Sequence, residues 1–109
     1  MIARIWHGKT TAEKADAYME EYFHQTGLAD YQGTEGNLGV LVLRKYEEGR
    51  ADFLMLTLWE SEDAIRKFAG EDINSARYYP EDKKYFAELE PSVVHYDVLV
   101  NHLNLKTSS

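Results

Sequence analysis

The chain has 109 residues, the size of one small domain, and 44% hydrophobic residues with 4 Phe, 8 Tyr and 2 Trp can supply a packed core. The formal net charge of -7 has the wrong sign for attraction to nucleic acid or to an anionic membrane surface, and no apolar run approaches the roughly 20 residues of a membrane-spanning helix. The absence of cysteine excludes disulfides, thiolate metal sites and cysteine nucleophiles. We therefore expect a cytoplasmic protein with neither nucleic acid nor membrane as a partner.

The first predicted elements are a strand over Ile2–Lys9 and a helix that follows it. Thr10 and Glu13 have the spacing of a capping box, and Gly27 supplies a stop signal. Between them, apolar residues recur at helical spacing, namely Ala15, Tyr18, Met19, Tyr22 and Phe23. This pattern predicts an amphipathic helix lying on an apolar surface.

Two long strands are predicted next, over Gly36–Glu47 and Ala51–Glu60, joined by a turn at residues 48–50. In the stretch Phe53–Trp59 both alternating sets of residues are apolar, which predicts a strand covered on both faces.

The second half of the chain predicts short helices and one more strand. Ser61 caps a helix that ends at Gly70, and Asp72 caps one or two further turns that end before Pro80. A third helical stretch is predicted over residues 82–88, and a final strand over residues 92–102.

The order β-α-β-β-α-β predicts an α+β, ferredoxin-like fold with a four-stranded antiparallel sheet and helices on one face. Because the strands are apolar on both faces, we expect a homodimer in which two sheets pack into a dimeric α+β barrel. We assign residues 1–103 to a single domain and residues 104–109 to a frayed tail.

Three stretches carry a family resemblance: Gly36–Gly39, Phe53–Ser61 and His95–Leu99. With this element order they resemble the antibiotic biosynthesis monooxygenase family, over about residues 1–101. The resemblance implies a dimeric barrel with a ligand pocket between sheet and helices. The family includes cofactor-independent oxygenases of quinols and aromatic polyketides, and also haem-degrading oxygenases.

The haem-degrading branch carries an asparagine on the first strand, a tryptophan at the end of the third and an axial histidine on the following helix. Only the tryptophan is matched, by Trp59; His7 and Tyr78 occupy the other two positions. A tyrosine phenolate can ligate ferric haem, so haem remains an alternative to the expectation of no cofactor.

His7 and Trp59 are the candidate catalytic residues. His7 shares a strand face with Ala3 and Ile5, and if that face meets the helices its imidazole could take a proton from a phenol or quinol. The alternative is a histidine hydrogen-bonded at the core edge. Trp59 could cover the mouth of a pocket or simply pack in the core.

The candidate substrate-binding residues are Arg77, Tyr78, Tyr79, Tyr22 and His95. A tyrosine hydroxyl could hydrogen-bond a quinone or enolate oxygen, and Arg77 would favour its negative charge. His95 shares a strand face with Asp97, as a base with its orienting carboxylate or as part of a dimer interface. No two histidines have metal-ligand spacing on one element, so we expect no metal.

The leading functional hypothesis is a cofactor-independent monooxygenase that oxidises a small planar aromatic, either a quinol or a polyketide-like phenol. The alternatives are a non-catalytic dimeric module that binds a hydrophobic ligand, and a haem-binding protein.

Overall fold

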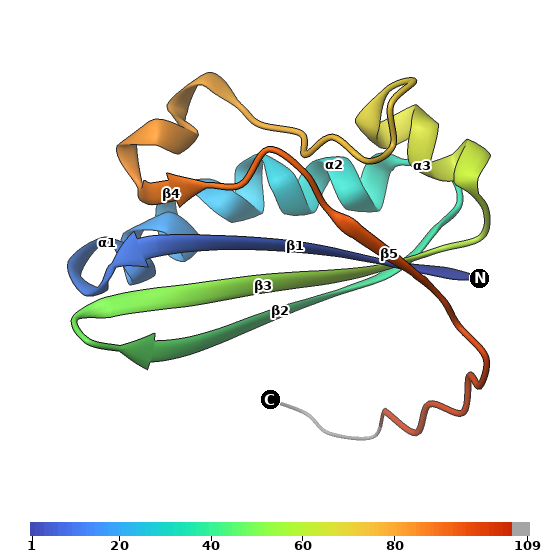
Figure 1. Ribbon diagram of the computed structural model, residues 1–109, viewed down its shortest axis with the longest axis horizontal. Helices are drawn as coiled ribbons and strands as arrows, with labels where there is room; N and C mark the ends of the chain where they lie inside the picture. Colours follow the sequence, from blue (N-terminus) through green and yellow to red (C-terminus); the bar gives the residue numbers. More distant parts are fainter. Residues whose placement is uncertain (106–109) are drawn as a thin grey trace.

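A five-stranded antiparallel sheet forms the base of the fold (Figure 1). The computed structural model describes residues 1–105. The strands are β1 (Ile2–Thr11), β2 (Asn37–Glu47), β3 (Arg50–Trp59), β4 (Phe86–Leu89) and β5 (Val94–Asp97). They lie in the order β2-β3-β1-β4, with β5 also paired to β1. The predicted α+β, ferredoxin-like architecture is confirmed.

The predicted fourth strand is divided in two. β4 pairs with β1 at Gly8–Thr10 and β5 pairs with it at Ile2–Ile5. Between them the chain leaves β1, and its main chain pairs with residues 74–76 through the Ala76 N–H to Pro91 O and Val93 N–H to Asn74 O bonds. The expected extension of the final strand to residue 102 is wrong, because β1 begins at Ile2 and the pairing stops after the bond from Val98 N–H to Met1 O.

The β2–β3 hairpin forms as predicted. Glu48 and Gly49 both have positive φ angles, of 50° and 77°, as the common two-residue hairpin turn requires. The two strands then pair without interruption from Gly39–Leu58 to Glu47–Arg50.

The first helical region differs from the prediction at both ends. Thr10 belongs to β1 and donates its hydroxyl to Thr11 O, so it does not cap the helix. Gly27 begins a helix instead of ending one. The chain passes through α1 (Ala12–Ala17), a π-helical turn η1 (Tyr18–Tyr22), a 3-10 turn η2 (Phe23–Gln25) and α2 (Gly27–Gly33).

The α3 helix (Glu62–Ala69) matches its sequence signals. The Ser61 hydroxyl accepts a hydrogen bond from Ala64 N–H, and Gly70 ends the helix with φ of 94°. Of the helices expected after it, the one over residues 82–88 is helical only at residues 82–84, within the 3-10 helix η3 (Pro80–Lys84) that precedes β4. The helical turns expected after Asp72 are wrong, because residues 71–79 (the 71–79 segment) are irregular. Pairing with the edge of β1 outweighs the local helical signal of residues 86–88.

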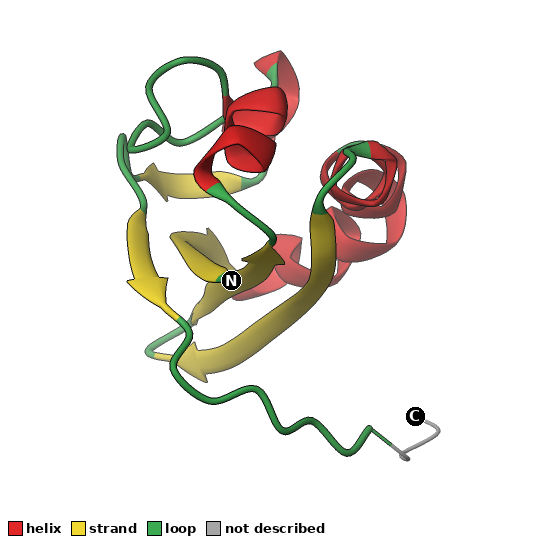
Figure 2. Ribbon diagram, turned by 90° about the vertical axis from the view of Figure 1, so that its right-hand side faces the viewer, coloured by secondary structure: helices red, strands yellow, loops and turns green. Residues whose placement is uncertain are grey.

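The sheet has two different faces (Figures 1 and 2). The helices and the 71–79 segment lie over one of them, which we call the inner face. The alternate residues of β3 from Ala51 to Trp59 are buried on it, while Leu54, Leu56 and Leu58 lie on the outer face. No helix in the described part of the chain is long and apolar enough to cross a membrane.

Candidate functional site

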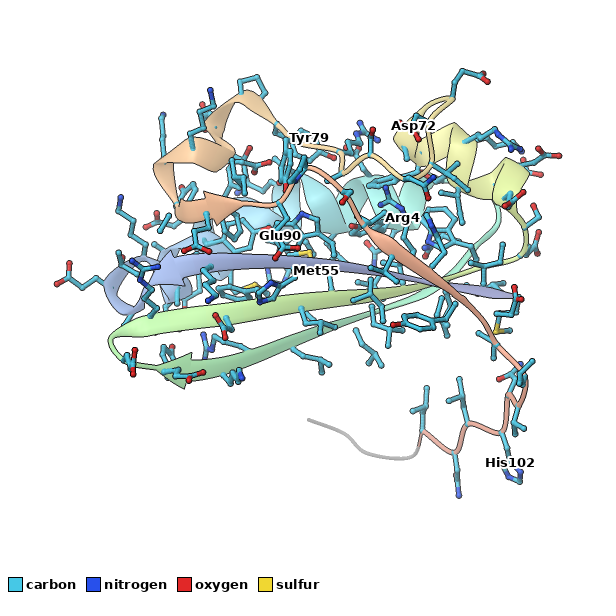
Figure 3. All side chains as sticks on the ribbon, viewed as in Figure 1. Arg4, Met55, Asp72, Tyr79, Glu90 and His102 are labelled. Atoms are coloured by element: carbon cyan, nitrogen blue, oxygen red, sulfur yellow. The ribbon has the colours of Figure 1, made fainter. Side chains whose placement is uncertain are left out.

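A small cavity lies between the inner face and the layer above it. Its volume is about 30 Å³, which is room for roughly two water molecules. Figure 3 shows Arg4 and Tyr79 entering this space from opposite layers. The groups on its wall that carry polar atoms include Arg4, Trp6, Tyr31, Tyr78, Tyr79 and Asp82.

Trp6 and Tyr78 close one side of the cavity. The Trp6 indole Nε1 donates to the Tyr78 hydroxyl oxygen at 3.0 Å, and that hydroxyl donates to the main-chain oxygen of Glu90. The Trp6 ring also meets Phe86 edge to face, with centroids 5.2 Å apart. Burial raises the pKa of Tyr78, so this phenol is a neutral group with both of its hydrogen-bonding functions in use.

Tyr79 and Arg77 join the 71–79 segment to α2. The Tyr79 hydroxyl and the Arg77 guanidinium both donate to the same oxygen of Asp30, the guanidinium at 3.1 Å. Arg77 also donates to the Phe68 carbonyl at 2.9 Å. Burial, followed by the hydrogen bond to Asp30, raises the pKa of Tyr79. These contacts fix the wall of the cavity and match the Arg77 charge with a carboxylate.

Asp82 supplies a carboxylate to the cavity wall. It is only 5% exposed, and it accepts a hydrogen bond from the Tyr79 N–H at 2.7 Å. Burial raises the pKa of Asp82 above its ordinary value of 3.8. Burial and the neighbouring Asp82 carboxylate raise the pKa of Tyr22 to about 12. A buried carboxylate whose pKa is raised is a stronger base than a solvated one, which makes Asp82 the base candidate of this cavity.

Arg4 projects from β1 into the same region and is 2% exposed. Its Nη2 donates to the carbonyls of Ser75 at 2.8 Å and Ile73 at 3.5 Å, and its guanidinium lies 5.6 Å from the Phe68 ring centre. Its Nε is buried and has no hydrogen-bond partner among the described residues. Burial lowers the pKa of Arg4, yet an arginine side chain stays charged in proteins.

His7 does not point toward the helices, and that expectation is wrong. Arg4, Trp6, Gly8 and Thr10 are the buried inner-face residues of β1, whereas His7 pairs with Leu54 on the outer face. Its Nδ1 contacts the Glu90 carboxylate at 2.8 Å. His7 therefore lies on the opposite side of the sheet from the cavity.

Trp59 lies in the core and does not line the cavity. It is fully buried, donates from Nε1 to the Thr57 hydroxyl at 2.8 Å, and packs against Phe68 and Tyr31. Packing in the core was the second of the two interpretations of Trp59 from the sequence.

His95 lies opposite Arg4 on the neighbouring strand and lines a separate hollow of about 250 Å³ with Glu62 and Asp97. Its Nε2 is buried without a partner. Burial, and then the Arg4 charge, lower the pKa of His95, with Glu62 opposing them. No hydrogen bond joins His95 to Asp97 in residues 1–105.

The structure thus brings Arg77, Tyr78 and Tyr79 to one cavity, with Tyr22 beside it. Sequence reasoning missed Arg4, Trp6 and Asp82. Arg4 and Trp6 alternate along β1, a signal that indicates a shared face but not which face is covered. Asp82 follows Pro80 at the third position of a helical turn, a capping signal that gives no hint of a functional role.

The residues present do not fit a haem in this conformation. Ligand pockets usually have volumes of about 300–1,000 Å³, and this cavity has about 30 Å³. The Tyr78 hydroxyl, the candidate axial ligand, is occupied by Trp6 and Glu90. Across residues 1–105, no group of three His, Cys, Asp or Glu side chains is arranged to hold a metal ion.

Comparison with known proteins gives structural relatives only. No protein-family model matches the chain, and no curated protein matches its sequence. Solved structures do match. A protein described as an antibiotic biosynthesis monooxygenase from Bacillus cereus has 15% identity and a TM-score of 0.63, over 94% of this chain and 97% of that one.

Two further structures have the same fold. One, described as an antibiotic biosynthesis monooxygenase from Nitrosomonas europaea, has 16% identity and a TM-score of 0.64, over 92% of this chain and 100% of that one. The other is the haem degrader MhuD from Mycobacterium tuberculosis with two haems in its active site, with 19% identity and a TM-score of 0.58 over 94% and 99% of the chains. These likenesses establish a shared fold and support the family resemblance seen in the sequence.

Proposed function

We propose that the protein belongs to the antibiotic biosynthesis monooxygenase family and oxidises a small planar aromatic, a quinol or a polyketide-like phenol, without a cofactor. The observation that carries this proposal is the inner cavity, where aromatic rings surround one buried carboxylate and two guanidinium groups. Aromatic walls suit a flat ring, and the polar groups suit an oxygen that becomes negatively charged.

The proposed reaction draws its electrons from the substrate. With the substrate written as RH₂, the balance is RH₂ + O₂ → R=O + H₂O, so one oxygen atom enters the substrate and the other leaves as water. Asp82 takes the first proton, the role expected of His7 from the sequence, and the resulting anion is electron-rich enough to react with oxygen. Tyr78, Tyr79 and Arg77 line the space that the charged oxygen would occupy.

Admission of an aromatic ring requires the cavity to widen. The wall with the least regular structure is the 71–79 segment, which is held by side-chain bonds such as Tyr79 to Asp30 and Tyr78 to Glu90. Segments held in this way open at lower free energy than a paired strand. We propose that this segment moves when the ligand binds.

We propose that the outer face pairs with a second copy of the chain. Its exposed apolar residues include Leu41, Leu43, Val94 and Tyr96, with exposed fractions between 47% and 58%. The C-terminal residues Leu103 and Leu105 add to an apolar hollow beside Leu38 and Leu56. An exposed group of apolar residues of this kind is typical of an interface.

Oxygen uptake with a panel of quinols tests the proposed reaction. Wild-type protein should consume oxygen, and Asp82→Asn should lower the rate by about 10²- to 10⁴-fold, as expected for loss of a general base. The matched variant His7→Asn should keep the rate within about three-fold, because its side chain lies across the sheet. Loss of activity in His7→Asn with retention in Asp82→Asn would return the base role to His7.

The pH dependence of that rate gives a second check. The anionic form of Asp82 is the active one, so the rate should rise with pH through an inflection above 3.8, the ordinary pKa of this carboxyl group. Asp82→Asn should remove the inflection. An inflection that survives this substitution belongs to another group.

Haem binding is the second candidate, because MhuD has the same fold, but the small cavity and the occupied Tyr78 hydroxyl argue against it. We expect no Soret band on titration with haemin, and a band that is lost in Tyr78→Phe would contradict this. A bound ligand with no turnover in any assay would favour the third possibility, a dimeric module that binds without chemistry.

A further inference from the structure

Arg4 is a buried charged side chain whose hydrogen bonds go only to neutral groups of the described chain. Arginine is rarely buried to this degree unless a carboxylate pairs with it, because removal of a charge from water costs several kcal/mol. Arg4 is 2% exposed, yet its hydrogen bonds go to two neutral carbonyls, those of Ser75 and Ile73. No carboxylate within residues 1–105 forms an ion pair with it.

The neighbouring groups do not cancel this charge. The charge of Arg77, which also lies over the Phe68 ring, is matched by Asp30. Asp82 shares the cavity, but its carboxylate accepts from the Tyr79 N–H and forms no ion pair with Arg4 in residues 1–105. His95 faces Arg4 across the strands with its own Nε2 unpartnered, and Tyr31 is a neutral phenol.

We propose that Arg4 is the anion-binding group of the cavity, and that the ligand is a planar aromatic acid whose ionised oxygen accepts a hydrogen bond from Arg4 Nε. The aromatic part of this proposal rests on the proposed function; the acidic part rests on Arg4 alone. The Nε–H is buried without a partner, whereas Nη2 donates to two carbonyls of the 71–79 segment, so a ligand oxygen admitted by movement of this segment would meet an unused donor.

An anion suits this position better than a neutral acceptor. A water molecule or a neutral carbonyl would satisfy Nε–H but would leave the buried positive charge unmatched. A carboxylate or phenolate supplies both the acceptor and the opposite charge, and such charge-assisted bonds are about twice as strong as neutral ones.

Calorimetric titration with two inert probes of equal shape tests the inference. The probes are 2-naphthoate and its neutral analogue 2-naphthamide. Wild-type protein should bind the naphthoate about 10-fold or more tightly than the amide. Equal affinities, or no binding of either probe, would overturn the proposal.

Variants at Arg4 assign the preference to this side chain. Arg4→Met should reduce the preference to within about two-fold, and Arg4→Lys, which keeps the charge but loses Nε, should give an intermediate value. Arg66→Met removes one positive charge from the exposed surface of α3 and should leave the preference unchanged. A folded Arg4→Met protein that still prefers the naphthoate would overturn the assignment.

Far-UV circular dichroism and thermal unfolding identify variants that fail to fold, and the comparison of the two probes on wild-type protein does not depend on any variant. The test is also separate from that of the proposed function. A preference for naphthoate without oxygen uptake would support the anion site and contradict the proposed oxygenase function. Oxygen uptake with neutral quinols and no preference for naphthoate would support the oxygenase function and contradict the anion site.

Discussion

The two faces of the sheet are built from alternate residues of the same strands, yet they differ in an unexpected way. On β3 the inner residues include Phe53, 1% exposed, and Thr57, also 1% exposed, whereas the outer residues Leu54, Leu56 and Leu58 are all aliphatic and half-buried. The inner face also buries Arg4 and its carbonyl partners. Between residues 54 and 58 of β3, the more uniformly apolar face is thus the uncovered one.

This difference shows that hydrophobicity alone does not identify the covered face of a sheet. Polar side chains can lie inside where loops offer hydrogen bonds, as the 71–79 segment does for Arg4. A face of leucines can lie outside when another copy of the chain covers it.

The largest expected effect comes from the same substitution on neighbouring residues of opposite faces. Met55→Glu places an unpaired charge at a position that is 4% exposed and should abolish folding, because its cost is comparable with the total stability of about 5–15 kcal/mol. Leu56→Glu should keep the native far-UV circular dichroism spectrum and give a monomer by light scattering.

A wild-type protein that is monomeric at micromolar concentration, or a Leu56→Glu protein that remains dimeric, would show that the outer face is not the interface. A folded Met55→Glu protein would contradict the assignment of the inner face itself.

A smaller effect is expected from glycines on the two faces. A Cβ added at Gly8 would lie 2.3 Å from the Trp6 ring, while one added at Gly39 meets nothing within 4 Å. Gly8→Ala should lower the free energy of unfolding by about 1–3 kcal/mol through displacement of the indole. Gly39→Ala should change it by no more than about 0.5 kcal/mol. Urea unfolding measures both, and equal losses would mean that the indole is not confined by Gly8.

The smallest expected effect is a pH dependence of stability from His95. Its pKa is lower in the folded protein than the ordinary 6.5, so the unfolded chain binds the proton more readily. The contribution of neutral His95 to the stability of the fold is present above pH 6.5 and is lost as the pH falls below that value. Between about pH 7 and about pH 5, the urea midpoint of unfolding should fall less steeply in His95→Gln than in wild-type protein, once the contribution of the carboxylates is subtracted from both slopes.

His24→Gln serves as the control, because His24 lies on the exposed side of the first helical region and contacts the Met19 carbonyl. It should keep the wild-type slope. A His95→Gln protein with that same slope would show that burial of His95 does not contribute to the pH dependence of stability.

The elements predicted best are those with local signals. The β2–β3 hairpin follows from its strand residues and its turn, and α3 follows from Ser61 and Gly70. The helix predicted over residues 82–88 failed at residues 86–88 because a four-residue edge strand depends on the free edge of β1, which no local pattern encodes.

The candidate site could be predicted only in part, for a similar reason. Arg77, Tyr78 and Tyr79 were found because consecutive polar aromatic residues are conspicuous. His7 was placed on the wrong side because Ala3 and Ile5 beside it are apolar, and Arg4 looks like a surface residue until the loop that accepts its hydrogen bonds is known. The face of β1 is decided by contacts with residues about 70 positions away.

The two tryptophans lie in different surroundings, so the intrinsic fluorescence of the chain can report on two separate events. Trp6 is hydrogen-bonded to Tyr78 on the proposed moving wall, whereas Trp59 is sealed in the core and bonded to Thr57 within its own strand. The emission of Trp6 should therefore follow movement of the wall, and that of Trp59 should follow unfolding. Replacement of either by phenylalanine separates the two signals, so opening and denaturation can be timed in the same molecule without an added label.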